Sequence, residues 1–244
     1  MAAPSLNSNL IYPELSYSII GAAMAVHNGL GPGWDEWDYH QSLVEALKNE
    51  GHVVVSHERG ELTRRESLID RFELDLLVDD KVILELKHIK TDFHPAHYAQ
   101  IINYLKYWRK RLGILVNFGL ERLAYARVPH DSLAGRVELT GKWSELPSMS
   151  RERVKQAVAA VLESPGYGYG VDVFRELLIA ELVFLGEDAR NLHIAPSFGM
   201  LVLEDREVDC VSIGSELLVS ISATSRNASS LDLARLKSYM RQSG

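Results

Sequence analysis

The chain has 244 residues, of which 46% are hydrophobic and 24% are charged, and its net charge is -7. This composition excludes a disordered chain, a collagen and a coiled coil, and the negative charge argues against a protein that coats nucleic acid nonspecifically. The single cysteine, Cys210, rules out an internal disulfide and a multi-cysteine zinc site. No apolar run approaches about 18 residues and no secretory signal is visible, so we expect a cytoplasmic protein with no membrane segment.

Hydrophobic periodicity and turn residues divide the first half of the chain into helices and strands. Apolar residues at helical spacing mark the helices, with proline at two starts and glycine after two ends. In chain order, we expect helices at 13–27 and 34–50, strands at 53–55, 72–78 and 82–86, a helix at 95–111 and a strand at 113–117. This order, ααβββαβ, is typical of a mixed three-layer α/β domain.

The second half of the chain repeats the pattern of the first. Residues 154–186 match residues 19–51 without gaps and share a Gly-x-Gly between two predicted helices. Later matches follow in the same order, including Glu73-Leu74-Asp75 with Glu207-Val208-Asp209. The alternative is that two small α/β segments share apolar spacing by chance. We expect one domain at 1–128, a polar connector containing Gly and Pro at 129–150, and a second copy at 151–244.

The predicted strands at 72–78 and 82–86 form a hairpin whose register follows from their apolar residues. One face of each strand is apolar, formed by Phe72, Leu74, Leu76 and Val78 and by Val82, Leu84 and Leu86. Burying both sets together places Val78 opposite Val82 across a loop of three residues, because a two-residue turn would separate the sets. In this register Asp75 faces Glu85 and Glu73 faces Lys87.

Two carboxylates that face each other in mid-sheet require a counter-charge, since like charges directly opposite cost roughly 0.2–1 kcal/mol. A divalent cation held by oxygen ligands is a natural one, and Lys87 supplies a second positive charge on the same face. The alternative is an exposed acidic sheet face with incidental pairs, in which Lys87 pairs with Glu73.

Asp75, followed by Glu85-Leu86-Lys87, resembles the motif of the PD-(D/E)XK nuclease superfamily. The segment Gly33-Trp34-Asp35-Glu36-Trp37-Asp38-Tyr39 is similar to the Gly-x-x-Glu-x-x-Tyr signature of the GxxExxY family, a branch of predicted nucleases within that superfamily. Further similarities are Gly31-Pro32-Gly33, Gln100, Tyr104 and Asn117-Phe118-Gly119. The resemblance covers about residues 12–125 and implies a restriction-endonuclease-like α/β fold, a mixed sheet flanked by helices.

The resemblance also implies a metal-dependent nuclease that hydrolyses phosphodiester bonds of DNA or RNA. Asp75 and Glu85 would bind Mg²⁺ or Mn²⁺, and Glu36 would reach the metal directly or through water. Lys87 would orient or help deprotonate the attacking water and offset charge on the phosphate. The alternative for Glu36 is an ordinary acidic residue in the first turn of a helix.

The predicted helix at 95–111 carries three further groups of polar residues. Gln100 and Tyr104 would place a polar face near the scissile phosphate, or would form a solvated stripe. A basic cluster consists of Lys106, Arg109, Lys110 and Arg111. It would follow a phosphate backbone while a neighbouring aromatic ring stacks on a base. The alternative, which we favour, is a solvated helix end. His94 and His97 lack further nearby ligands and are expected at the start of the helix.

The second copy lacks the residues that carry the chemistry. Asp209 aligns with Asp75, but with one extra residue allowed in the hairpin Ser220-Ile221-Ser222 replaces Glu85-Leu86-Lys87. Val171 stands in place of Glu36 and Arg235 in place of Gln100, while Cys210 is expected in the core. We therefore expect a degenerate copy that packs against the first as a pseudo-dimer or extends a nucleic-acid surface, with homo-oligomers left open. The rival interpretation of the whole chain is a noncatalytic module that binds nucleic acid or protein.

Overall fold

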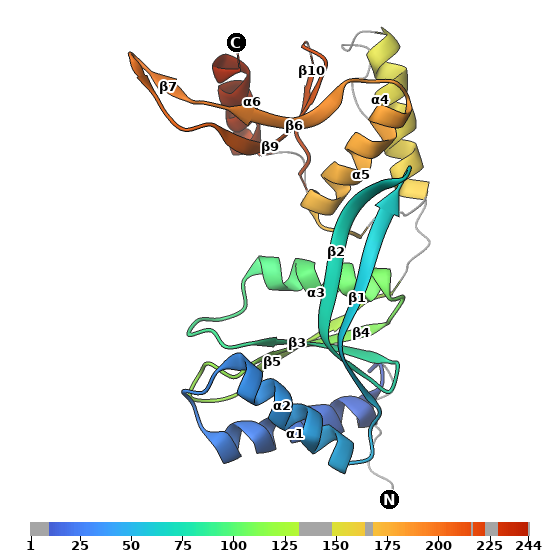
Figure 1. Ribbon diagram of the computed structural model, residues 1–244, viewed down its shortest axis with the longest axis vertical. Coiled ribbons are helices and arrows are strands. Elements are labelled where there is room, and N and C mark those ends of the chain that lie inside the picture. Colours follow the sequence, from blue (N-terminus) through green and yellow to red (C-terminus); the bar gives the residue numbers. More distant parts are fainter. Residues whose placement is uncertain (1–9, 132–147, 164–167, 216, 223–228, 244) are drawn as a thin grey trace, which may run out of the picture. The chain divides into compact units, whose positions relative to one another are not determined.

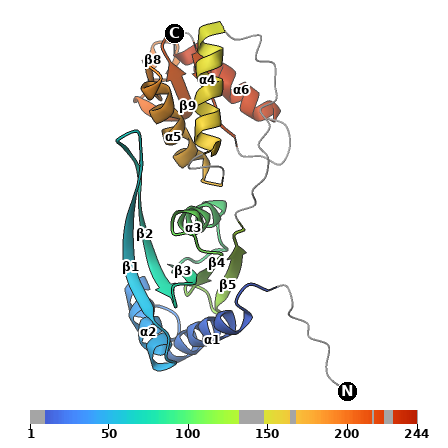
Figure 2. The same cartoon turned by 90° about the vertical axis from the view of Figure 1, so that its right-hand side faces the viewer.

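The computed structural model describes residues 10–131, 148–163, 168–215, 217–222 and 229–243 (Figures 1 and 2). It divides into two compact units, one formed by residues up to 62 and from 71 to 134, the other by residues 63–70 and from 135 onward. This division departs from the expected boundaries at residues 63–70, which lie with the second unit. Most of the predicted connector lies outside the described residues.

The first unit contains a five-stranded mixed sheet and three helices. Its elements are α1 (Pro13–Leu30), α2 (Glu36–Asn49), β1 (Val54–Arg64), β2 (Ser67–Val78), β3 (Val82–Lys87), α3 (Pro95–Tyr107), β4 (Leu112–Asn117) and β5 (Ala124–Pro129). The strand order is β1-β2-β3-β4-β5; β3 and β4 are parallel, and β4 and β5 are antiparallel. The predicted order of elements is confirmed, with β5 added at the end. The helix α3 ends four residues earlier than expected, and Arg109 just beyond it has left-handed backbone.

The predicted register of the β2–β3 hairpin is confirmed over the three paired positions nearest the turn. Val78 pairs with Val82 and Leu76 with Leu84, so the turn has three residues. Phe72 is an exception to the predicted apolar face. Leu76 belongs to the core beneath α1 and α2, whereas the ring of Phe72 packs edge-on against Tyr104 of α3, with ring centroids 5.8 Å apart. The strand therefore changes the face it presents between Phe72 and Leu76.

The sheet of the first unit is covered on both faces, by α1 and α2 on one side and by α3 on the other (Figures 1 and 2). The core on the first side joins Ile19 and Ala22 of α1 and Leu43 of α2 to alternate residues of β2, β3 and β4. On the other side, a Cβ at Gly113 would lie 2.5 Å from a side-chain carbon of Ile101, so glycine at this point lets α3 approach β4 closely. Coverage on both faces explains why β3 and β4 are almost entirely buried.

The second unit has helices and strands in a similar order. Its elements are α4 (Ser148–Val161), α5 (Val171–Phe184), β6 (Ala189–Ile194), β7 (Ser197–Phe198), β8 (Leu201–Val202), β9 (Arg206–Ile213), β10 (Leu217–Val219) and α6 (Ser230–Gln242). The sheet order β10-β9-β6 corresponds to β3-β2-β1 of the first unit. Within the described residues, nothing in this unit corresponds to β4 and β5. No helix in the described parts of the chain is long and apolar enough to cross a membrane.

The hairpins of the two units have turns of the same length. Ile213 pairs with Leu217, which leaves three residues between β9 and β10. The extra residue expected in this hairpin therefore does not lie in the turn. The irregularity lies instead along β9, where the pairing with β6 shifts between Val211 and Val208 and leaves Asp209 and Cys210 unmatched. Cys210 is fully buried, as expected of a core residue, and burial raises the pKa of its thiol to about 11.

Candidate functional site

The start of α2 is fixed by Tyr39. Its ring is fully buried and stacks on Phe118, with centroids 4.6 Å apart, and its hydroxyl donates a hydrogen bond of 2.7 Å to the carbonyl of Gly31. The chain between the two helices turns through Gly31 and Gly33, both with positive φ, which glycine adopts without strain. The tyrosine and the glycines of the resemblance thus set where α2 begins, and its first residue is Glu36.

The two predicted acidic ligands lie on neighbouring antiparallel strands at the edge of the regular pairing. Backbone pairing of β2 with β3 ends at Leu76, and Asp75 is the next residue. The Oδ2 atom of Asp75 accepts a hydrogen bond of 2.6 Å from the backbone N–H of Leu86. The carboxylate of Asp75 is therefore held directly against the Glu85–Lys87 segment.

Glu85 is a buried carboxylate, and only one of its two oxygens accepts a hydrogen bond within the described part of the chain. Its exposure is 2%, and Oε1 accepts a hydrogen bond of 2.6 Å from the ammonium of Lys87. Oε2 is buried and has no hydrogen-bond partner in the described part of the chain. Because a buried charged oxygen without a partner is costly, this atom fits a site that receives a cation.

The pKa values of both acids are shifted upward, chiefly by burial. Burial, followed by the charge of Asp75, raises the pKa of Glu85 from 4.5 to about 7, although Lys87 opposes the shift. Burial also raises the pKa of Asp75, against the hydrogen bond from Leu86 and the charge of Lys87. Burial acts to lower the pKa of Lys87. The charge of Glu85 and the hydrogen bond between the two side chains act more strongly in the opposite direction, so the pKa of Lys87 is raised. Lys87 therefore remains an ammonium group at neutral pH.

The chain after β3 is held by Asn117. The side chain of this buried residue accepts hydrogen bonds from the backbone N–H groups of Ile89 and Gly119, both at 3.0 Å, and donates to the carbonyls of Ile89 and Thr91. A Cβ at Gly119 would lie 2.5 Å from the backbone of Ile89, so only glycine allows this close approach. These contacts fix the segment that immediately follows Lys87.

A pocket of about 180 Å³ lies beside the acidic pair. Its lining comes from α2, β1, β2 and β3 and consists of Glu36, Trp37, His40, His57, Asp75 and Leu86. No three His, Cys, Asp or Glu side chains within the described residues converge closely enough to hold an ion. The structure thus brings Asp75 and Glu85 together and places Glu36 on the wall of the pocket.

The sequence did not single out the two histidines of this pocket. His40 follows Glu36 by four residues and so shares a face of α2, which is a signal that the spacing offered. Its Nε2 lies 2.8 Å from Oγ of Ser56, and burial lowers its pKa. His57 lies on β1, and only the strand order β1-β2-β3 brings it beside Asp75. That order was not predicted.

The candidate residues of α3 do not line the pocket. His94 and His97 form the start of this helix, with the backbone N–H of His94 3.1 Å from Nδ1 of His97. Burial and the charge of Lys87 lower the pKa of His97, so this end of α3 lies near Lys87. Gln100, one turn further, donates a hydrogen bond of 2.8 Å to the hydroxyl of Tyr104. The ring of Tyr104 is buried in an aromatic cluster and does not line the pocket.

The basic cluster lies away from the pocket. Lys110 forms an ion pair of 2.5 Å with Asp80 in the β2–β3 turn, and Arg111 forms one of 3.2 Å with Asp131. The turn lies just before β3, whereas Lys87 is the last residue of that strand. Neither these residues nor Lys106 and Arg109 line the pocket.

In the second unit, a buried arginine lies beside Asp209. Arg175 of α5 is 8% exposed, and its guanidinium lies 3.1 Å from Asp172, 3.3 Å from Glu207 and 3.6 Å from Asp209. Arg235 of α6 lies 3.8 Å from the same Asp209. The carboxylate of Asp209 is therefore already paired with cations of the protein.

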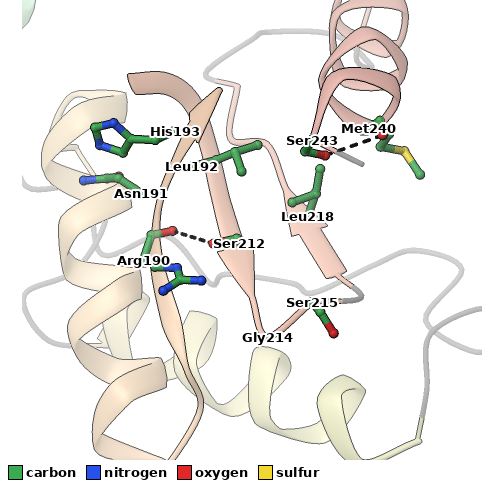
Figure 3. Close-up of a pocket in the computed structure, with 10 residues that line it drawn as sticks. All are labelled: Arg190, Asn191, Leu192, His193, Ser212, Gly214, Ser215, Leu218, Met240 and Ser243. Carbon is green, nitrogen blue, oxygen red and sulfur yellow. Dashed lines mark hydrogen bonds between the residues drawn. The ribbon is translucent and has the colours of Figure 1, made fainter. Parts of the chain in front are cut away.

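A larger cavity of about 710 Å³ lies elsewhere in the second unit, among β6, β9, β10 and the end of α6 (Figure 3). Arg190 and His193 are among its lining residues, and no carboxylate is. Oγ of Ser212 donates a long hydrogen bond of 3.4 Å to the carbonyl of Arg190. The lining of this cavity thus lacks the carboxylates through which proteins usually bind Mg²⁺.

The sequence of the first unit matches the model of a known protein family. The family model of the PD-(D/E)XK nuclease superfamily matches residues 13–128, the range that holds Glu36, Asp75, Glu85 and Lys87. Together with the mixed sheet flanked by helices, this match shows a restriction-endonuclease-like fold.

No curated protein matches the chain. A solved structure, titled "Crystal structure of SSO0001", is similar at 18% identity and a TM-score of 0.32, over 64% of this chain and 69% of that chain. A TM-score this low supports no argument about fold or function.

Proposed function

We propose that the first unit is a divalent-metal-dependent nuclease of the GxxExxY type, which hydrolyses phosphodiester bonds of DNA or RNA. The observation that carries the proposal is the buried pair of Asp75 and Glu85, in which Oε2 of Glu85 has no partner within the described residues. A divalent cation is the chemical species that would offset two buried carboxylates and make a nearby water more acidic.

Three acids would serve the cation in two ways. Asp75 and Glu85 would hold Mg²⁺ or Mn²⁺ directly, since each is fixed by a hydrogen bond of 2.6 Å and the charge of one raises the pKa of the other. Glu36, on the wall of the same pocket, would act through a water molecule. Such an ion would supply charge stabilisation for the phosphate and a more acidic water molecule.

Lys87 would act as a cation toward the substrate. Its raised pKa keeps it protonated, so it would orient the attacking water and offset charge that develops on the phosphate, and would not remove a proton itself. Gln100 lies one turn after His97, which is near Lys87, and would present an amide to the same region. The hydroxyl of Tyr104 would hold that amide in place.

The second unit would be a copy that has lost the chemistry. The same order of elements and of strands in the sheet supports a common origin, and Arg175 occupies the region where acids would otherwise require a metal. Its role would be structural or in binding nucleic acid. For the whole chain, a noncatalytic module is the competing function.

The direct test is to incubate the protein with single- and double-stranded DNA and RNA and with Mg²⁺ or Mn²⁺, beside a Lys87→Ala variant. We expect cleavage that requires the metal and is lost in the variant. Cleavage that persists unchanged in the variant would show a contaminating nuclease. No cleavage, together with no heat of Mn²⁺ binding in calorimetry, would favour the noncatalytic module.

A further inference from the structure

Trp37 is an exposed aromatic side chain at the edge of the acidic pocket. It is the second residue of α2, directly after Glu36, and it lines the same pocket as Asp75. Its exposure is 58%, which is large for an indole beside a pocket. A ring that is both exposed and adjacent to the site invites contact with a ligand.

Two imidazole rings support the indole from within the protein. His40 stacks on Trp37 with centroids 5.2 Å apart and ring planes 6° from parallel, and His57 stacks at 5.8 Å and 25°. The two imidazoles also stack on each other, with centroids 4.6 Å apart. The indole is therefore backed by a small stack of rings and does not lie loose on the surface.

The supporting histidines are themselves held in place. His40 is 4% exposed and contacts Ser56, and Nδ1 of His57 lies 3.1 Å from a carboxylate oxygen of Glu73. His57 has a φ of 54°, a left-handed conformation that is unfavourable for a residue with a Cβ. The ring of His57 thus stacks on Trp37 from a residue with a strained backbone conformation.

From this geometry we infer that Trp37 is a stacking platform for an unpaired base next to the scissile phosphate. A rigid ring backed on one side leaves its exposed surface for another planar group, and base–aromatic stacking is sequence-tolerant. Both faces of a base inside a duplex are already covered by its neighbours, so an unpaired base stacks on the indole more readily than a base within a duplex. The preferred substrate is then single-stranded, and this inference rests on the proposed nuclease function.

The chain offers a matched control in Trp34. This indole is 51% exposed and lies three residues earlier, but its Nε1 donates a hydrogen bond of 3.0 Å to the carbonyl of Leu30, and it does not line the pocket. Trp34→Ala and Trp37→Ala remove side chains of the same size and similar exposure from the same segment. Only Trp37→Ala removes a ring from the pocket.

The experiment measures the affinity of labelled DNA and RNA single strands and of the matching DNA duplex by fluorescence anisotropy. The Lys87→Ala background with Mg²⁺ prevents turnover. We expect Trp37→Ala to weaken binding of either single strand about 5- to 100-fold and to change duplex binding less than about twofold. Trp37→Phe should restore most of the loss, and Trp34→Ala should bind like the parent. Unchanged Mn²⁺ affinity in Trp37→Ala would show that the loss is not a general collapse of the site.

Two outcomes would separate failure of this inference from failure of the proposed function. If the wild-type protein cleaves nucleic acid but Trp37→Ala binds single strands as well as Trp34→Ala does, the platform is wrong and the nuclease stands. Trp37 would then be a surface for a protein partner. If the wild-type protein neither cleaves nor binds any of the nucleic acids, the nuclease function is wrong and the platform falls with it.

Discussion

The acidic side chains of the two units have opposite surroundings. In the first, Asp75 and Glu85 are brought together with one ammonium, and an oxygen of Glu85 remains without a partner in the described part of the chain. In the second, the guanidinium of Arg175 lies among Asp172, Glu207 and Asp209. Under the proposed function, the first site would take a cation from outside, whereas the acids of the second unit already lie beside arginines of the protein.

This difference shows that the fold alone does not decide the chemistry. Both units have two helices before a hairpin and a helix after it, and both hairpins have turns of three residues. What differs is which side chains occupy the strand positions farther from the turn and the helix that faces them. Variants that exchange or remove these charges should therefore affect the two units differently.

The largest expected effect comes from neutralising the acids. Asp75→Asn and Glu85→Gln should each lower the cleavage rate by about 10²–10³-fold, because each removes a ligand charge without changing the size of the side chain. Asp209→Asn in the second unit is the matched control and should leave the rate unchanged. The measurement is the initial rate of cleavage of a labelled oligonucleotide at saturating Mn²⁺. Equal losses in all three variants would contradict the distinction between the units.

Lower pH should weaken the binding of Mn²⁺ to the first unit, because Glu85 becomes protonated. Its pKa is raised to about 7, and the carboxyl must lose its proton to bind a cation. Affinity for Mn²⁺ should therefore fall about tenfold for each pH unit below 7 and level off above about pH 8. Calorimetric titrations across this range measure the dependence. An affinity for Mn²⁺ that is constant down to about pH 5.5 would be inconsistent with binding of the ion by the buried carboxylates of Asp75 and Glu85.

In the second unit, Arg175→Met should be destabilising. The change leaves Asn191 without its 3.0 Å donor, at a cost of about 1–3 kcal/mol in the free energy of unfolding, and the loss of the cation beside three partly exposed carboxylates adds little to this. Arg235→Met, which removes an exposed guanidinium 3.8 Å from Asp209, should cost less than about 0.5 kcal/mol. Urea denaturation curves provide the comparison. If both variants unfold alike, Arg175 does not hold the acids together.

Glu85→Gln should have a smaller effect, in the stabilising direction. The folded protein raises the pKa of Glu85 from 4.5 to about 7, so it holds a proton that the unfolded chain releases, and stability from this group is lost as pH rises through 7. The amide resembles the protonated acid. The metal-free variant should therefore be about 1–2 kcal/mol more stable than the wild type at pH 8 and nearly equal at pH 4. A variant that is less stable at pH 8 would contradict this assignment.

The sequence predicted the parts of the first unit that depend on alternating apolar residues. The strands around Val78 and Val82 could be paired because only one register buries both apolar sets, and that register brought Asp75 toward Glu85. β5 was missed because its burial is only partial, and polar residues interrupt it. The full length of β1 was missed for a similar reason, since most of its residues are exposed or half-buried.

The neighbours of the site were harder to predict. His57 reaches Trp37 only because β1 lies beside β2 and because its own backbone is left-handed, and no local pattern specifies either feature. Phe72 follows the apolar alternation but packs against α3, since the strand changes face near Asp75. Spacing therefore indicated the acids and the lysine, whereas the rings around them required the three-dimensional arrangement.

Binding of Mn²⁺ to the intact protein, counted by electron paramagnetic resonance at about pH 8, tests most directly the claim that only the first unit needs an external cation. We predict one bound ion per chain, lost in Asp75→Asn and kept in Asp209→Asn. No bound ion in the wild type, or one that survives Asp75→Asn, would contradict it.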